Sequence, residues 1–129
     1  PAVLIMMDID YFKQINDGYG HTVGDAVIEE FARLMKACLR DMDYFLRYAS
    51  YALIAADTAI LNERVLNGLD DTYKSLGVPT GPTVRSIALL ADVICEMLSD
   101  AGVGDAAAVV RNPFDHLCRG LAASNVRAR

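Results

Sequence analysis

The sequence predicts a mainly α-helical domain organised around one long helix. Residues 25–67 contain neither glycine nor proline, the residues least compatible with a helix interior. Apolar residues recur there at steps of three or four, the spacing of an amphipathic helix and not of a strand. They are Val27, Phe31, Leu34, Cys38, Met42, Phe45, Ala49 and Leu53. We therefore expect a single helix over 25–55, roughly 45 Å long at 1.5 Å per residue.

A short strand-turn segment is expected before this helix, over residues 1–24. Residues 3–8 form an apolar run that ends at Asp8, and it is too short to cross a membrane. Glycines on both sides of His21 favour a turn. We expect a strand over 3–8.

Shorter helices are expected after the long one. Asp57 and Thr58 can cap a helix over 59–66. The Asn67-Gly68 pair is expected to end it, because glycine disfavours a helix interior. A second short helix is then expected over 69–76.

Glycine and proline also mark the ends of the next helix. Gly77 suits the position just after a helix, and Pro79 prevents continuation. Pro82 fits the first turn of a helix that ends near Gly102. Its expected buried face comprises Val84, Ile87, Leu90, Ala91, Ile94, Met97 and Leu98.

The last helical segment is expected to be interrupted. It begins at Asp105, and Asn112-Pro113 is expected to stop it because proline lacks an N–H group. Asn112 can then cap a restarted helix. The residues expected to face inward are Phe114, Leu117, Cys118 and Leu121.

Composition indicates one domain and excludes some partners. The chain has 129 residues, 53% of them hydrophobic, and a net charge of −5. This charge argues against nucleic acids and anionic membrane surfaces as partners. Three widely spaced cysteines indicate neither a disulfide framework nor a metal site, so a reducing cytosol fits best. No signal peptide or membrane span is expected.

A cluster of functional side chains lies on the long helix. Cys38 and Asp41 are three residues apart, so both project from nearly one face, and Arg40 and Arg33 flank it. A thiol, a carboxylate and two guanidinium groups suit a large conjugated anion. The alternative from spacing alone is that Cys38 is a small core residue and the charges are solvated.

The sequence around this cluster resembles a known family. Residues 37–52, Ala-Cys-Leu-Arg-Asp-Met-Asp-Tyr-Phe-Leu-Arg-Tyr-Ala-Ser-Tyr-Ala, closely resemble the chromophore-bearing helix of phycobiliproteins, above all of allophycocyanin β subunits. The resemblance continues through 57–69 and 72–79, weakens after about Ile87 and returns at 114–121. It implies a globin-like helical bundle, here truncated, within a single domain.

The resemblance also implies a ligand. In phycobiliproteins the cysteine that matches Cys38 carries a linear tetrapyrrole, or bilin, through a thioether bond. The aspartate that matches Asp41 hydrogen-bonds the pyrrole nitrogens, and the arginines that match Arg40 and Arg33 meet the propionates. A covalent bilin of the phycocyanobilin type and a light-harvesting, non-enzymatic role are therefore expected.

Other candidate residues are less specific. Tyr44 and Tyr73 match family positions that line the pigment pocket, although either also suits half-buried packing. No second ligand stands at metal-binding spacing from the remaining cysteines or histidines, so packing or surface roles are expected. These residues are Cys95, Cys118, His21 and His116.

Residues 2–36 resemble a different family and not a phycobiliprotein. Residues 3–25 look like the start of a GGDEF domain, the diguanylate cyclase module. There, the aspartate that matches Asp8 binds a metal, and the residues that match Asn16 and Asp25 read guanine. The signature loop is absent after Arg47-Tyr48, so we expect no cyclase activity and a strand-cap role for Asp8 and Asp10.

Three interpretations follow. The first is a bilin-binding, light-harvesting module, for which a natural, a chimeric and an engineered origin are left open. The second is an inactive α/β GGDEF-like domain, and the third is an engineered helical scaffold without a ligand. The family's N-terminal helices are not recognisable, so apolar faces would be exposed. We expect self-association, first of all as a dimer, and consider a phycobiliprotein partner subunit doubtful.

Overall fold

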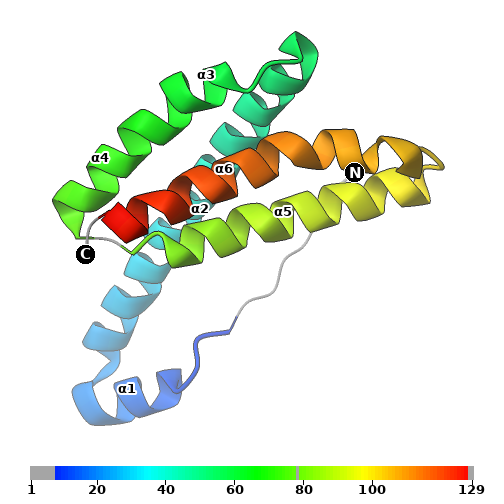
Figure 1. The fold of residues 1–129 in the computed structure, drawn as a ribbon. Coiled ribbons are helices and arrows are strands. Elements are labelled where there is room, and N and C mark those ends of the chain that lie inside the picture. The colour runs from blue at the N-terminus through cyan, green and yellow to red at the C-terminus, as the bar shows by residue number, and fades with distance from the viewer. Residues whose placement is uncertain (1–7, 78, 128–129) are drawn as a thin grey trace. The chain divides into compact units, whose positions relative to one another are not determined.

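The computed structural model describes residues 8–77 and 79–127, and every regular element in that part of the chain is a helix (Figure 1). The elements, in order, are α1 (Phe12–Tyr19), α2 (His21–Ala55), α3 (Ala59–Leu61), the π-helical turn η1 (Asn62–Leu66), α4 (Asn67–Leu76), α5 (Gly81–Asp100), the 3₁₀ turn η2 (Gly104–Ala106) and α6 (Ala107–Arg127). The chain forms two compact units, and the boundary between Leu39 and Arg40 falls within α2.

The mainly α fold is confirmed. The helix predicted over 25–55 is a single helix that begins earlier, at His21, so the predicted turn around His21 is wrong at that residue. No strand occurs in the described ranges, and the α/β alternative is therefore wrong. The strand predicted over 3–8 lies outside the described residues except for Asp8, which is not in a strand.

The first unit contains α1 and the N-terminal half of α2. Gly20, with φ of 85°, ends α1, and its N–H donates to the Asn16 carbonyl over 2.9 Å. Gly24 is buried, and a Cβ at this position would collide with the Asn16 side chain. The turn and the close approach both require glycine, because other residues disfavour positive φ or fill the space.

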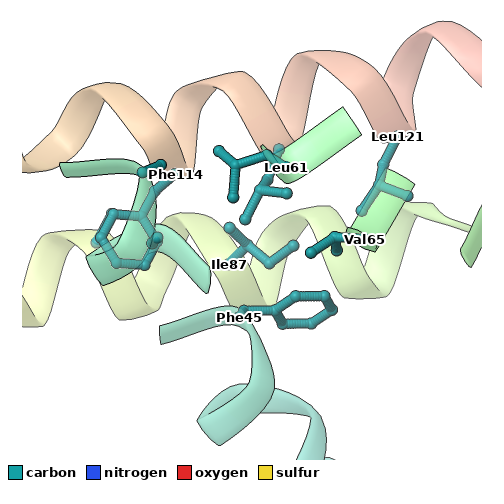
Figure 2. Packing of buried hydrophobic residues seen from close by; sticks show 10 residues of the cluster. Phe45, Leu61, Val65, Ile87, Phe114 and Leu121 are labelled. Atoms are coloured by element: carbon teal, nitrogen blue, oxygen red, sulfur yellow. The ribbon is translucent and has the colours of Figure 1, made fainter. Parts of the chain in front are cut away.

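The second unit holds the hydrophobic core. α5 and α6 lie side by side in opposite directions (Figure 1), and α3 and η1 pack against α6. The core side chains come from the C-terminal half of α2 and from α3, η1, α5 and α6 (Figure 2). They are Phe45, Ala49, Ala52, Leu61, Val65, Ile87, Ala91, Phe114, Leu117 and Leu121. Full burial of each larger side chain stabilises the fold by roughly 1.5–3 kcal/mol.

Close helix packing depends on one glycine in α6. A Cβ at Gly120 would lie 2.8 Å from Leu66 Cδ2, so a larger residue here would force the half-buried Leu66 side chain of η1 to move. Nearby, the buried Thr80 hydroxyl donates to the Leu121 carbonyl over 3.3 Å.

Several predicted helix ends are confirmed. The Asp57 carboxylate accepts a hydrogen bond from the Ala59 N–H over 2.8 Å, as expected of a cap. Gly77 has a positive φ of 63°, and Pro82 lies in the first turn of α5. Gly102, with φ of 75°, follows the end of α5.

Two predicted interruptions are wrong. Helical structure continues from η1 into α4 through Asn67-Gly68, and α6 continues through Pro113. Glycine costs about 1 kcal/mol and proline about 3 kcal/mol inside a helix. The burial of Phe114 and Leu117 next to Pro113 stabilises α6 by a similar or larger amount, so the helix persists.

No helix in the described ranges is both long enough and apolar enough to cross a membrane.

Candidate functional site

A groove of about 410 Å³ opens in the second unit between α2, η1 and α4. Its volume lies within the range of roughly 300–1,000 Å³ that small-molecule sites occupy. The lining residues are Arg40, Asp41, Tyr44, Arg64, Val65, Gly68, Leu69 and Thr72. Charged groups and apolar side chains therefore meet in one depression.

Each lining element contributes a different group. α2 supplies Arg40, Asp41 and Tyr44 through helical spacing. The π turn supplies Arg64, and π turns inside α-helices often occur at functional sites. No atom lies within 4 Å of a Cβ placed on Gly68, so the glycine leaves the groove open at that point.

The charges in the groove are accessible. Arg40 Nη2 lies 3.4 Å from Asp41 Oδ1, a long contact between side chains that are 80% and 46% exposed. A solvent-exposed pair of this kind contributes little to stability. The Asp41 carboxylate can therefore accept N–H groups from a ligand, while Arg40 can donate to carboxylates.

Tyr44 joins two walls of the groove. Its hydroxyl donates to the Arg64 carbonyl over 2.5 Å, and its ring centroid lies 4.7 Å from that of Tyr48. Burial raises the pKa of Tyr44 above its ordinary value, and the neighbouring Tyr48 raises it further. The hydroxyl therefore stays protonated, and it holds α2 against η1.

Cys38 is an exposed free thiol on α2 and belongs to the first unit. It precedes Asp41 by three residues in the same helix. The other two cysteines are half-buried: Cys95 Sγ lies 3.7 Å from the Ala107 carbonyl, and Cys118 Sγ lies 3.6 Å from the Val84 carbonyl. Burial raises the pKa of Cys118, with a smaller contribution from Asp115. These contacts fit the expected packing role of both.

Arg33 also lies in the first unit and is paired. Its guanidinium donates to Glu30 through two hydrogen bonds, of 2.8 and 2.5 Å. The hydrogen bond from Arg33 lowers the pKa of Glu30. A ligand carboxylate at Arg33 would have to displace this neighbour.

Tyr73 does not line the groove. Its hydroxyl is 3.0 Å from Thr83 Oγ1, which joins α4 to α5. The structure thus brings Arg40, Asp41 and Tyr44 together at one site, and Tyr73 contacts a different helix.

Sequence reasoning does not single out Arg64, Gly68 or Thr72. All three lie within segments that resemble phycobiliproteins, 57–69 and 72–79, but nothing in their spacing relates them to α2. Only the fold brings η1 and α4 against Arg40 and Asp41.

No metal-binding cluster is found among the described residues. His116 Nε2 instead lies 2.7 Å from Asn62 Oδ1, a contact between α6 and η1.

Comparison with known proteins points to one family. A family model described as phycobilisome protein matches residues 19–121. The chain is 53% identical to allophycocyanin subunit beta-18 of Nostoc sp. over 94 residues, 73% of this chain and 55% of that protein. It is 58% identical to the same subunit of Picosynechococcus sp. over 89 residues, 69% and 52% of the two chains. The phycobiliprotein beta chain of Mastigocladus laminosus is 48% identical over 94 residues, 73% and 55%.

The chain spans about half the length of the relatives it matches. The family match begins at residue 19, so the expectation that residues 2–36 lack phycobiliprotein character is wrong for 19–36. These matches do not support the GGDEF resemblance.

Proposed function

The chain belongs to the phycobilisome protein family, and we propose that it is a light-absorbing module that binds a linear tetrapyrrole of the phycocyanobilin type. The observation that carries this proposal is the groove in which Arg40, Arg64 and Asp41 meet apolar Val65 and Leu69. When bound, such a pigment supplies visible absorption through its conjugated system.

The groups in the groove suit the chemistry of a bilin. Its two propionates need cationic donors, which Arg40 and Arg64 provide as lining residues of the groove. Its pyrrole N–H groups need an acceptor, and the carboxylate of Asp41 accepts only. The apolar side chains of Val65 and Leu69 offer a surface for the rings.

Cys38 is proposed as the attachment residue. Its thiol is exposed. Cys38 precedes Asp41 by three residues in the same helix, and side chains with this spacing occupy neighbouring positions on one helix face. Thioether formation adds the thiol across a pigment carbon–carbon double bond: a C–S bond forms, and the proton goes to carbon. Cys95 and Cys118 are half-buried, so Cys38 is the better nucleophile.

Arg33 and Tyr73 keep their proposed pigment roles only with rearrangement. Arg33 must leave Glu30, and Tyr73 must leave Thr83. We propose that Arg64 performs the role that the resemblance assigns to Arg33, since it already lines the groove.

Co-expression with a bilin-producing pathway tests the proposal. We expect visible absorbance that remains with the chain on a denaturing gel. Cys38→Ala should abolish this covalent colour, whereas the matched variants Cys95→Ala and Cys118→Ala should retain it. Colour that depends on Cys95 or Cys118 would contradict the site.

Three further variants test the groove itself. Asp41→Ala should keep the covalent bond but shift absorbance to the blue, because the pigment loses its acceptor. Gly68→Leu should reduce pigment loading by filling the groove, whereas Gly68→Ala, with a far smaller side chain, should reduce it less. Equal loading in all three variants would show that the pigment lies elsewhere.

We also propose that the chain self-associates, most simply as a dimer, and that it works in the cytosol. Large apolar side chains are exposed on α2 and α5, among them Leu34, Leu39, Leu89, Val93 and Met97. Light scattering that returned a monodisperse species of 14.0 kDa would contradict self-association. The cysteines are free thiols, which suits a reducing compartment.

A further inference from the structure

Tyr44 lines the groove and also links α2 to the backbone of the π-helical turn η1. Its hydroxyl donates to the Arg64 carbonyl over 2.5 Å, between residues 20 positions apart in the sequence. Its ring packs against Tyr48, with centroids 4.7 Å apart, and meets Phe45 edge-on at 6.3 Å. Phe45 is 1% exposed and Tyr48 packs against the core, so these contacts restrict the direction of the Tyr44 hydroxyl.

The turn that accepts this hydrogen bond has an unusual register. The Asn67 N–H donates to the Asn62 carbonyl, five residues earlier, whereas in an uninterrupted α-helix it would donate to Glu63, four residues earlier. The turn thus holds one residue more than an α turn. Because successive α-helical residues are about 100° apart, the extra residue rotates the side chains of α4 by that angle relative to those of α3. Which face η1 and α4 present to the groove therefore depends on the π turn.

We propose that Tyr44 is a positioning residue, whose hydroxyl holds the π turn in this register and thereby directs Arg64 toward a carboxylate of the bound ligand. The inference rests on the proposed function, in which Arg64 meets a propionate of the pigment. Two contacts hold the turn: Val65, 1% exposed, anchors it in the core, and the Tyr44 hydroxyl anchors the Arg64 backbone from the wall of the groove.

Reversible binding of phycocyanobilin to the Cys38→Ala chain, measured by absorbance titration, separates a positioning role from a direct contact. Tyr44→Phe should weaken binding about fivefold, and Arg64→Gln by at least as much. In the Arg64→Gln background, Tyr44→Phe should add less than about twofold, because Tyr44 acts through the Arg64 guanidinium. Losses that multiply in the double variant would show that the hydroxyl contacts the pigment directly, and would overturn the positioning role.

A second probe and a matched variant control this measurement. The dimethyl ester of phycocyanobilin has the same rings but no carboxylates, so Tyr44→Phe should change its affinity by less than about twofold. Tyr51→Phe makes the same substitution at an exposed residue of α2 that does not line the groove, and it should leave the affinity for phycocyanobilin unchanged. An equal loss for the acid and the ester in Tyr44→Phe would also overturn the role.

Hydrogen exchange in the pigment-free chain, followed by NMR, tests the π turn by itself. Tyr44→Phe should speed the exchange of the Asn67 amide about fivefold, while amides of residues 84–94 in α5 change by less than about twofold. An unchanged Asn67 amide would overturn the inference. Failure of phycocyanobilin to bind any variant would instead refute the proposed function and the ligand assigned to Arg64; the Asn67 amide would still decide whether Tyr44 holds the turn.

Discussion

The two halves of α2 have the same apolar periodicity but unequal burial. In the C-terminal half, Phe45, Ala49 and Ala52 are at most 3% exposed, and they belong to the core. In the N-terminal half, Ile28 and Leu34 are 46% and 50% exposed. The comparison teaches that periodicity determines which face of a helix is apolar, whereas other elements determine whether that face is covered.

The largest expected difference between the halves is in hydrogen exchange. Backbone amides of residues 45–52 should exchange at least about a hundredfold more slowly than those of 25–35 in the monomeric chain, because only the former lie in a packed core. Mass spectrometry of exchanged fragments measures the ratio. Equal protection in both fragments would mean that the N-terminal half is covered after all.

Truncating one phenylalanine in each half should separate their contributions to stability. Phe45→Ala should lower the free energy of unfolding by about 3–5 kcal/mol, because it leaves a cavity in the core. Phe31→Ala, at a partly exposed residue, should lower it by less than about 1 kcal/mol. Urea denaturation, at concentrations where the chain is monomeric, gives both values. A similar loss in the two variants would contradict the comparison.

Alanine substitution at two glycines of the second unit compares a packed position with an open one. Gly120→Ala should destabilise the fold by about 1–3 kcal/mol, because its Cβ would collide with Leu66. Gly68→Ala should stabilise it by up to about 1 kcal/mol, because open space surrounds that position inside a helix. Thermal unfolding of the pair should therefore shift in opposite directions, and a shift in the same direction would rule out the described packing of α6 on η1.

The smallest expected effect is a pH dependence that arises from two groups of the second unit. Burial raises the pKa of Cys118 above its ordinary value of 9.0 and that of Tyr44 above 10.0. Because the unfolded chain releases these protons first, the stability is complete below about pH 9 and falls as pH rises through the raised values. In the double variant Cys118→Ala, Tyr44→Phe, the denaturation midpoint should fall less steeply with rising pH, between about pH 8 and 11, than it does in the unsubstituted chain. An unchanged slope would show that neither group contributes.

Much of the candidate site could be predicted from the sequence. Arg40, Asp41 and Tyr44 are close in the chain, and helical spacing alone brings them together. Arg64 could not be found in this way, since its position in the groove depends on how η1 packs beside α2. The resemblance assigns Tyr73 to the pigment pocket, but its hydroxyl contacts Thr83. The roles of Cys38 and Arg33 remain predictions.

The sequence by itself determined the long helix, its apolar faces and most helix ends. These features follow from interactions between residues a few positions apart, such as the cap at Asp57 and the positive φ at Gly77. Only the tertiary structure decided that Gly68 and Pro113 lie inside helices, and that one half of α2 is buried. The physical reason is that local costs of about 1–3 kcal/mol are outweighed where several side chains from distant parts of the chain are buried together. The stabilisation from this burial depends on contacts between distant residues, which no local sequence pattern contains.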